Sequence, residues 1–343
     1  MSASLFPSQD PREAERQDFL RENGLAASRI EALPADASPR RYFRLHGTGR
    51  PQLLMDVAPG AADFEPFLAV ARHLTALGFS APRIEAVDTG LGLAVIEDFG
   101  NRTFTRLLAD GADEKGLYEL AVDTLVALHR SDAARHIDLP RYDEGPLFME
   151  LEMFTDWFAP VIDPQIDVAA FRAEFLGLWR SALEPVVRQT DALVLRDFHV
   201  DNLMVVEGRQ GVAACGLLDF QDALLGSPAY DLASLTQDAR RDLAPGLEPH
   251  LLARYLAARP ELDAPRFTAD YHLLAAHRHT KVAGNFERLS RRDGKHGYLV
   301  HIPRVLRLLD KAMAAAGLDA IRAFLDRNLP GWAAWPPAGR LQP

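Results

Sequence analysis

The sequence is poor in cysteine and in lysine. Cys215 is the single cysteine, so the chain cannot form an intramolecular disulfide, and a metal site built from several thiolates is excluded. Lysine supplies 4 of the 38 basic residues, and the first hundred residues contain none. This second absence limits the ways in which that part of the chain can hold an anionic ligand.

Long apolar runs and dense basic segments are also missing. No run of about eighteen apolar residues could cross a membrane, and the N-terminal stretch lacks the continuous apolar core of a signal peptide. The net charge is −10, and Lys and Arg are not concentrated in a block that would bind nucleic acid. We therefore expect a cytoplasmic globular protein that has neither nucleic acid nor a membrane as its partner.

The first hundred residues have the pattern of a small antiparallel sheet with helices. Two β-like runs, 42–45 and 52–57, flank a turn rich in Gly and Pro and predict a hairpin. Apolar residues at helical spacing over 64–77 predict an amphipathic helix that ends at Gly78. Two further strand-like runs span 83–87 and 91–96, and a short amphipathic helix is predicted at 10–24.

Beyond residue 101 the pattern is mainly helical. Two β-like pieces, 192–206 and 212–226, are each interrupted by a cluster of polar residues, which is typical of strands whose loops face a cleft. The sequence thus predicts an α+β protein with a β-rich lobe at 1–99 and a helical lobe at 100–343. Amphipathic helices are predicted at 117–129, 148–158, 171–187, 271–289 and 305–316.

The polar clusters of the two β-like pieces contain the residues that phosphoryl transfer requires. Asp197 and Asn202 are five residues apart, and Asp219 follows Asp197 by 22 residues. A carboxylate can orient or deprotonate an attacking hydroxyl, while Asn and Asp oxygens can hold Mg²⁺ against the phosphates of ATP. We predict Asp197 as the catalytic carboxylate and Asn202 and Asp219 as metal ligands.

These residues resemble the signature of the protein-kinase-like superfamily. In protein kinases an Arg-Asp catalytic loop with a downstream Asn is followed by a metal-binding Asp-Phe. This chain has Arg196-Asp197, Asn202 and Asp219-Phe220 at those positions. The resemblance implies a two-lobed protein-kinase-like fold, with a small antiparallel β-sheet in the N-terminal lobe and a larger, mainly helical C-terminal lobe.

His199 and the run 219–223 instead resemble the aminoglycoside-phosphotransferase branch, whose members phosphorylate small molecules. Within this branch the chain most resembles the kinases that phosphorylate N-acetylmuramate and N-acetylglucosamine at the anomeric C1 hydroxyl in peptidoglycan recycling. The resemblance implies ATP and Mg²⁺ as cofactors and a monomeric enzyme with an amino-sugar substrate. The similar stretches lie at 37–44, 53–56, 195–204, 216–232 and 291–299.

The nucleotide is expected in the N-terminal lobe, where the chain departs from most kinases. Their third strand carries a lysine that contacts the phosphates, and the corresponding run 53–56 has none, so either an arginine substitutes or the enzyme manages without. Arg41 and Arg44, with Ser38 in the same hairpin segment, are the predicted phosphate ligands, because guanidinium groups bind phosphate oxygens well. The residues predicted to hold the adenine are Glu97, Asp98 and Phe99.

The acceptor sugar is expected in the helical lobe. Glu152 and Trp157 are candidates for contacts to its hydroxyls and ring, although a Trp at helical spacing is commonly a core residue. The lactyl carboxylate of N-acetylmuramate requires a cation, and the candidates are Lys281, Arg291, Arg292 and Lys295.

Three other polar residues have roles that the sequence leaves open. His199 either braces the catalytic loop by hydrogen bonding or touches the substrate. Asp222 and Asp231 are expected to organise the second loop and the helix that follows it, and Asp222 is also a candidate to reach a metal-bound water.

Other functions remain possible at this stage. A kinase of the same class could take an aminoglycoside, choline or homoserine, and a cationic acceptor would require an acidic pocket. The missing lysine also leaves room for a non-catalytic ATP-binding scaffold. A hydrolytic metal site on His272, His277 and His279 is disfavoured, because their spacing does not place a pair on one helix face at i, i+4.

Overall fold

The computed structural model describes residues 10–25, 29–34 and 40–335. The chain divides into two compact units, one formed by residues 1–107 and 201–222 and the other by residues 108–200 and 223–343. Ser38, a predicted nucleotide contact, lies outside the described residues. The boundary predicted after residue 99 stays a prediction.

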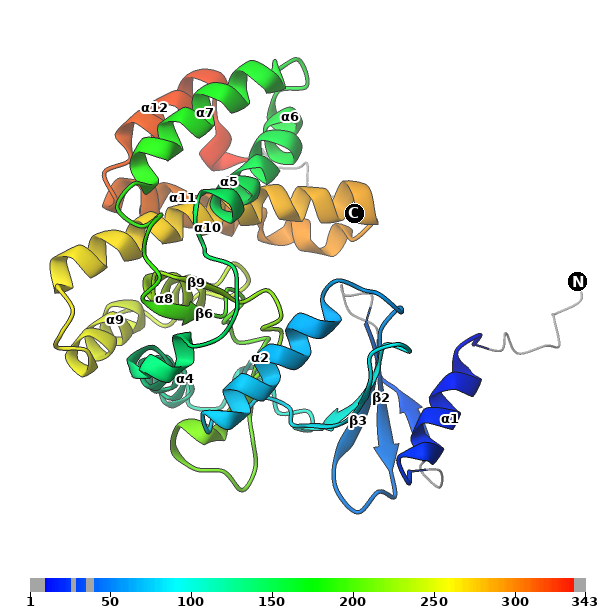
Figure 1. Ribbon diagram of the computed structural model, residues 1–343. Coiled ribbons are helices and arrows are strands. Elements are labelled where there is room, and N and C mark those ends of the chain that lie inside the picture. Colours follow the sequence, from blue (N-terminus) through cyan, green and yellow to red (C-terminus); the bar gives the residue numbers. More distant parts are fainter. Residues whose placement is uncertain (1–9, 26–28, 35–39, 336–343) are drawn as a thin grey trace, which may run out of the picture. The chain divides into compact units, whose positions relative to one another are not determined.

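A five-stranded antiparallel sheet forms the centre of the first unit (Figure 1). The predicted hairpin is present, and it pairs Phe43 with Leu54. Because successive side chains of a strand point to opposite faces, Tyr42 and Arg44 face one side of the sheet and Phe43 the other. The strand order is β1 (Arg29–Ala32), β2 (Arg41–His46), β3 (Gln52–Asp56), β5 (Leu93–Glu97) and β4 (Ile84–Asp88).

Two helices, α1 (Glu13–Glu22) and α2 (Phe64–Ala76), flank this sheet from opposite sides in Figure 1. Phe19 and Leu20 of α1 belong to the apolar cluster that contains Phe43. Arg16 also donates to Asp56 of β3 at 2.6 Å, so the first helix is fixed to the sheet by apolar contact and by charge.

The segment 201–222 completes the first unit as a second, short hairpin. Its strands β7 (Leu203–Val205) and β8 (Cys215–Leu217) pair antiparallel and are followed by the loop that contains Asp219. Bridges from Ser80 to Gly216 and from Thr103 to Met204 attach this hairpin to the rest of the unit. The remaining elements are α3 (Phe104–Ala109) and the 3₁₀ turn at Gly211–Ala214.

The second unit is mainly helical and is organised around the 30-residue helix α10 (Ala264–Asp293). Asp263 caps its start by accepting a hydrogen bond from Arg266 N at 3.0 Å, and Gly294 ends it with a φ of 68°. A Cβ atom on Gly284 would lie 2.2 Å from the backbone carbon of Met153, so only glycine permits the approach of these two segments.

Among the other helices of this unit, those at 114–130, 144–153, 168–183 and 302–315 match amphipathic stretches predicted from the sequence, whereas those at 159–162, 229–236, 247–258 and 319–328 were not predicted. These helices are α4 (Glu114–Arg130), α5 (Glu144–Met153), α6 (Ala159–Ile162), α7 (Val168–Leu183), α8 (Ala229–Thr236), α9 (Leu247–Ala258), α11 (Ile302–Ala315) and α12 (Asp319–Asn328). The short elements are a π-helical turn at Phe154–Phe158, 3₁₀ turns at Asp132–Arg135, His296–His301 and Trp332–Ala334, and the strand pair β6 (Ala192–Val194) and β9 (Leu224–Gly226).

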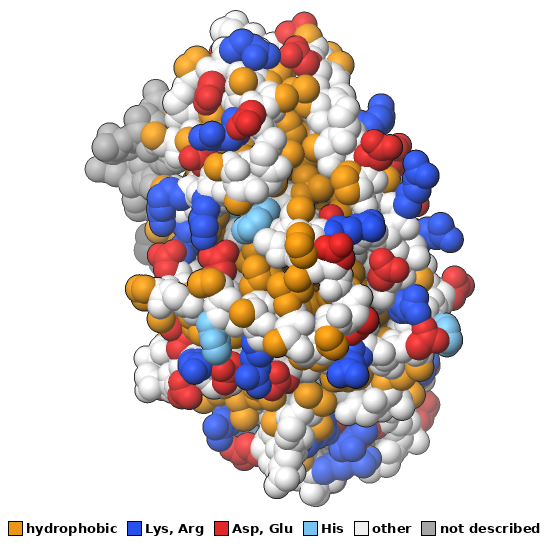
Figure 2. Space-filling view, turned by 90° about the vertical axis from the view of Figure 1, so that its left-hand side faces the viewer, with side chains coloured by type: hydrophobic (Ala, Val, Ile, Leu, Met, Phe, Trp, Pro, Cys, Tyr) orange, Lys and Arg blue, Asp and Glu red, His pale blue; other side chains and the backbone are white. Residues whose placement is uncertain are grey.

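The predicted α+β class is confirmed by a β-rich first unit and a helical second unit. Within the described ranges, no helix combines the length and the apolar character needed to cross a membrane. On the face drawn in Figure 2, Lys and Arg side chains are interspersed with Asp and Glu side chains rather than gathered in one large patch.

Candidate active site

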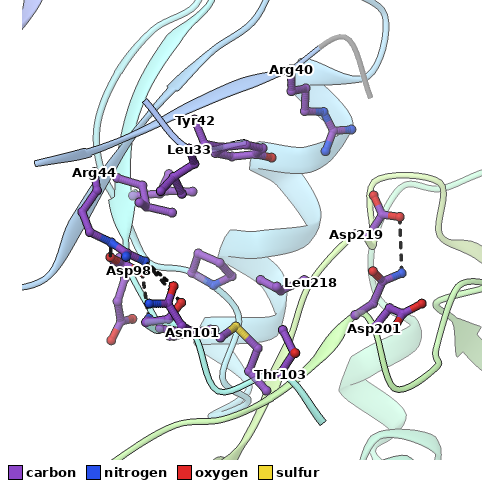
Figure 3. A pocket seen from close by; sticks show the side chains of 18 of the residues that line it. Leu33, Arg40, Tyr42, Arg44, Asp98, Asn101, Thr103, Asp201, Leu218 and Asp219 are labelled. Carbon is purple, nitrogen blue, oxygen red and sulfur yellow. Dashed lines mark hydrogen bonds and ion pairs between the residues drawn. The ribbon is translucent and has the colours of Figure 1, made fainter. Parts of the chain in front are cut away.

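A pocket of about 420 Å³ lies in the first unit (Figure 3). Its size falls within the range of small-molecule sites. Leu53 and Ile96 from the sheet and Leu218 from the second hairpin give it apolar walls, and charged residues surround them. Such a lining suits a ligand that has an apolar ring at one end and anionic groups at the other.

The two predicted metal ligands meet in this pocket. Asn202 Nδ2 lies 3.3 Å from Asp219 Oδ2, and the backbone N–H of Leu218 donates to the carbonyl of Asn202 at 3.0 Å. Asp219 has a φ of 59°, a conformation that a non-glycine residue adopts at a cost. Their amide and carboxylate oxygens are the hard ligands that Mg²⁺ accepts, so this pair fits a magnesium ion.

An arginine that the sequence analysis missed lies on the same side of the pocket. Arg40 Nε and Nη2 donate to Asp63 at 2.9 and 2.7 Å, and Arg40 Nη1 donates to Gln221 at 2.9 Å. Gln221 in turn donates to Asp219 Oδ1 at 3.0 Å. The alternation of strand residues could have revealed Arg40, because residues 40, 42 and 44 share one face of the strand while residue 41 faces the other.

Arg41 and Arg44, the predicted phosphate ligands, do not lie on the Asp219 side of the pocket as Arg40 does. Arg44 lines the pocket but donates to Asp98 at 2.5 Å and to Asn101 at 3.0 Å, on the side away from Asp219 (Figure 3). Arg41 binds Asp10 at 2.5 Å and does not belong to the pocket lining. The geometry therefore brings Arg40 and Arg44 to the pocket and leaves Arg41 outside it.

The predicted adenine-binding residues Glu97, Asp98 and Phe99 all line the pocket. The backbone N–H of Asp98 donates to Pro51 at 3.2 Å. The guanidinium of Arg209 lies 5.3 Å from the centre of the Phe99 ring, which holds that ring in place.

The second unit contains the loop that follows β6 and carries Asp197, the predicted catalytic carboxylate. The backbone N–H groups of Leu195 and Arg196 both donate to the carboxylate of Asp231, at 2.7 and 2.8 Å. Asp231 is fully buried in α8, and Arg196 has a φ of 67°. Asp231 thus holds the residue before Asp197 in a strained conformation, because two hydrogen bonds to a buried carboxylate offset the backbone cost.

A buried carboxylate on α5 supports the same loop from another direction. Glu150 accepts hydrogen bonds from Lys281 at 2.8 Å and from Tyr142 at 2.5 Å, and it also pairs with Arg196. Burial opposes ionisation of Glu150, but the positive charges of Lys281 and Arg196 outweigh it and lower its pKa to about 2. Lys281, a predicted sugar ligand, is therefore one partner of a buried ion pair.

The surroundings of Asp197 favour its ionised form. Burial raises the pKa of Asp197, but electrostatic interactions with Lys281, His199 and Arg278 lower it by more, so its pKa lies below the ordinary value. Burial lowers the pKa of His199 itself. An ionised carboxylate is the state in which Asp197 can accept a proton from a hydroxyl group.

Arg278 is a second residue that the sequence analysis missed. Its side chain is buried, and its Nη1 atom has no hydrogen-bond partner in the part of the chain that the structure describes. It lies three residues before Lys281 on α10, so both cations share one helix face. This spacing was visible in the sequence, but the burial was not.

The other predicted acceptor residues are less buried. Arg292 is exposed at the end of α10 and binds Asp293 at 2.7 Å, and Arg291 lies 3.4 Å from Glu287. Glu152 and Trp157 are half-buried on α5 and the π-helical turn. Asp222, in the first unit, is exposed and accepts a hydrogen bond from Gln221 at 3.3 Å.

Two of the three histidines on α10 are core residues. His277 Nε2 lies 2.9 Å from the carbonyl of Leu147, and His279 Nε2 lies 3.0 Å from Gln237 Oε1. The described residues contain no group of three or more His, Cys, Asp or Glu side chains arranged for a metal ion.

Comparison with known proteins agrees with this geometry. Residues 29–271 match the family model described as "Phosphotransferase enzyme family". The chain is 37% identical to an N-acetylmuramate/N-acetylglucosamine kinase of Caulobacter vibrioides, over 93% of this chain and 97% of the relative. It is 38% identical to the Pseudomonas aeruginosa protein of the same name, over 83% and 84% of the two chains.

The chain belongs to the phosphotransferase enzyme family. Solved structures of similar fold include a choline/ethanolamine kinase family protein from Mesorhizobium loti, with a TM-score of 0.57 and 16% identity over 94% of this chain and 99% of that one. The ADP-bound aminoglycoside phosphotransferase APH(2'')-Ib has a TM-score of 0.56 and 14% identity over 87% and 99% of the chains.

These comparisons confirm the predicted fold and the predicted resemblance. They also confirm the prediction that the chain is a phosphotransferase. The roles of the individual site residues stay predictions.

Proposed function

We propose that this phosphotransferase uses ATP and magnesium to phosphorylate the C1 hydroxyl of N-acetylmuramate and N-acetylglucosamine, giving sugar 1-phosphates and ADP during peptidoglycan recycling. The observation that carries the proposal is the pairing of Asn202 with Asp219 in a pocket of ligand size. Asp197, which is held ionised, precedes Asn202 by five residues in the same loop. The names of the relatives support the choice of acceptor.

Asn202, Asp219 and Asp197 have different roles in the proposed reaction. Asn202 and Asp219 would hold magnesium, which supplies positive charge to the phosphates when it is bound. Asp197 orients the C1 hydroxyl and accepts its proton as the sugar oxygen bonds to the γ-phosphorus. The bond from that phosphorus to the oxygen shared with the β-phosphate breaks, and ADP leaves with the electron pair.

The helical unit also offers a partner for the carboxylate of N-acetylmuramate. Lys281 and Arg196 form ion pairs with Glu150, whereas Nη1 of the buried Arg278 has no hydrogen-bond partner among the described residues. A buried guanidinium is stabilised when an anion reaches it. Arg278 therefore replaces Lys281 and Arg292 as our candidate for binding this carboxylate.

The same charges weigh against the alternatives. Arg278, whose Nη1 atom has no hydrogen-bond partner among the described residues, places a positive charge near Asp197, which disfavours an aminoglycoside or choline as the acceptor. A scaffold that only binds nucleotide has no use for a carboxylate kept ionised by buried cations.

The test is ADP release from ATP and magnesium with each free sugar and with its 1-O-methyl derivative, alongside kanamycin, choline and homoserine. We expect turnover of both free sugars and none of the methylated forms, because methylation removes the attacking hydroxyl. Turnover of a cationic acceptor alone would refute the proposed substrate, and turnover of none would support the scaffold.

A further inference from the structure

The absence of lysine from the first hundred residues leaves open which cation contacts the nucleotide's phosphates. Among the described residues, the cations that line the pocket are Arg40, Arg44 and Arg106. Each is an arginine, and a guanidinium can donate two parallel hydrogen bonds to a phosphate group.

We infer that Arg40 takes the place of the missing lysine and binds the phosphate groups of the nucleotide. This inference rests on the proposed function, since it assumes that the pocket takes ATP. Asp219 would hold magnesium against the phosphates, so the cation that binds the phosphates is expected near Asp219. Arg40 is linked to Asp219 through the single side chain of Gln221.

The positions of the other two arginines fit this role less well. Arg44 is held by Asp98 and Asn101 on the side of the pocket away from Asp219, near the predicted adenine end (Figure 3). Arg106 is exposed on α3, where water competes with any anion that it binds. Arg40 is 5% exposed, so its charge acts in a poorly solvated site.

Arg40 is also held in place before any ligand arrives. Asp63, the residue at the start of α2, accepts two of its N–H groups at 2.9 and 2.7 Å. Its guanidinium lies 5.6 Å from the centre of the Phe67 ring, and Phe67 stacks on Phe220 with ring centres 5.4 Å apart. Because Phe220 follows Asp219, one packed group fixes both the cation and the metal-binding loop. A guanidinium has five N–H donors, so Arg40 can keep Asp63 while it donates to a phosphate oxygen.

The test compares binding of ADP with binding of adenosine by isothermal titration calorimetry. We expect Arg40→Gln to weaken ADP binding by about 10- to 100-fold, the usual effect of losing a charge-assisted hydrogen bond. Adenosine carries no phosphate, so its affinity should stay within about 2-fold. Arg40→Lys should restore part of the ADP affinity. Arg72→Gln is the matched control, because it removes one positive charge from an exposed position of α2 outside the pocket.

Two results would overturn the inference: unchanged ADP affinity in Arg40→Gln, or an equal loss for ADP and adenosine, which would show that Arg40 only maintains the fold. Failure of the proposed function looks different. If the unsubstituted protein binds neither compound, the nucleotide site itself is refuted, and if it binds ADP but phosphorylates no sugar, Arg40 keeps its role and the acceptor is wrong.

Discussion

The substitution Glu150→Gln removes a buried negative charge from between two cations. The pKa of Glu150 falls from its ordinary 4.5 to about 2, after burial is outweighed by Lys281 and Arg196. That difference corresponds to roughly 3 kcal/mol of stability contributed by the ionised carboxylate. The side chain is only 4% exposed, so solvent screening reduces this figure little.

The sign of the pH dependence follows from the direction of the change. Because the pKa of Glu150 is lower in the folded protein, its contribution is complete above the ordinary pKa of 4.5 and is lost as the pH falls towards 2. We expect Glu150→Gln to lower the free energy of unfolding by about 3 kcal/mol at pH 7. The difference between the two proteins should shrink when the pH is taken below 4.5.

Urea unfolding followed by tryptophan fluorescence reports the stability of the helical unit, in which Glu150 lies. All 4 tryptophans, Trp157, Trp179, Trp332 and Trp335, belong to the helical unit that contains Glu150. Glu174→Gln is the control, because it breaks an exposed ion pair with Arg327 in the same unit and should cost less than about 1 kcal/mol. Equal losses in the two variants, or a loss in Glu150→Gln that is the same at every pH, would refute the reasoning.

Further outcomes follow from the site and the packing. Asp197→Asn should lower kcat by about 10²- to 10⁴-fold in the ADP-release assay with little change in ADP affinity, and full activity would remove its role. Arg278→Gln should raise KM for N-acetylmuramate by about 10-fold or more and leave KM for N-acetylglucosamine within about 2-fold, since that sugar has no carboxylate; equal changes would contradict the assignment. Gly284→Ala should strongly destabilise the helical unit in urea, because its Cβ would lie 2.2 Å from Met153, whereas Gly177→Ala, with nothing within 4 Å, should be neutral or stabilising.

Local patterns predicted most of the elements. The alternation around the 42–57 hairpin and the helical spacing at 64–77 were sufficient, because these elements depend mainly on neighbours close in the chain. Asp197, Asn202 and Asp219 could be selected because their chemistry and spacing are specific as a set. The same alternation places Arg40 on the strand face that carries Arg44, but the prediction named Arg41 instead.

Pairings between distant residues could not be obtained in this way. Glu150, Arg196 and Lys281 are separated by 46 and 85 residues, and no local pattern indicates that they share one buried site. Whether a charged residue is solvated or buried depends on such contacts. Lys281 therefore looked like a ligand for a sugar carboxylate when its nearest anion is a carboxylate of the protein itself.

The attachment of α1 to the sheet has a consequence for the pocket on the other face. Arg12 and Arg16 both reach the buried carboxylate of Asp56, and Phe19 covers Phe43. Deletion of residues 1–22 would leave the buried carboxylate of Asp56 without Arg12 and Arg16. It would also expose apolar surface behind the strand that carries Arg44. We expect such a shortened protein to lose ADP binding, measurable by calorimetry, although it would keep all the residues that line the pocket.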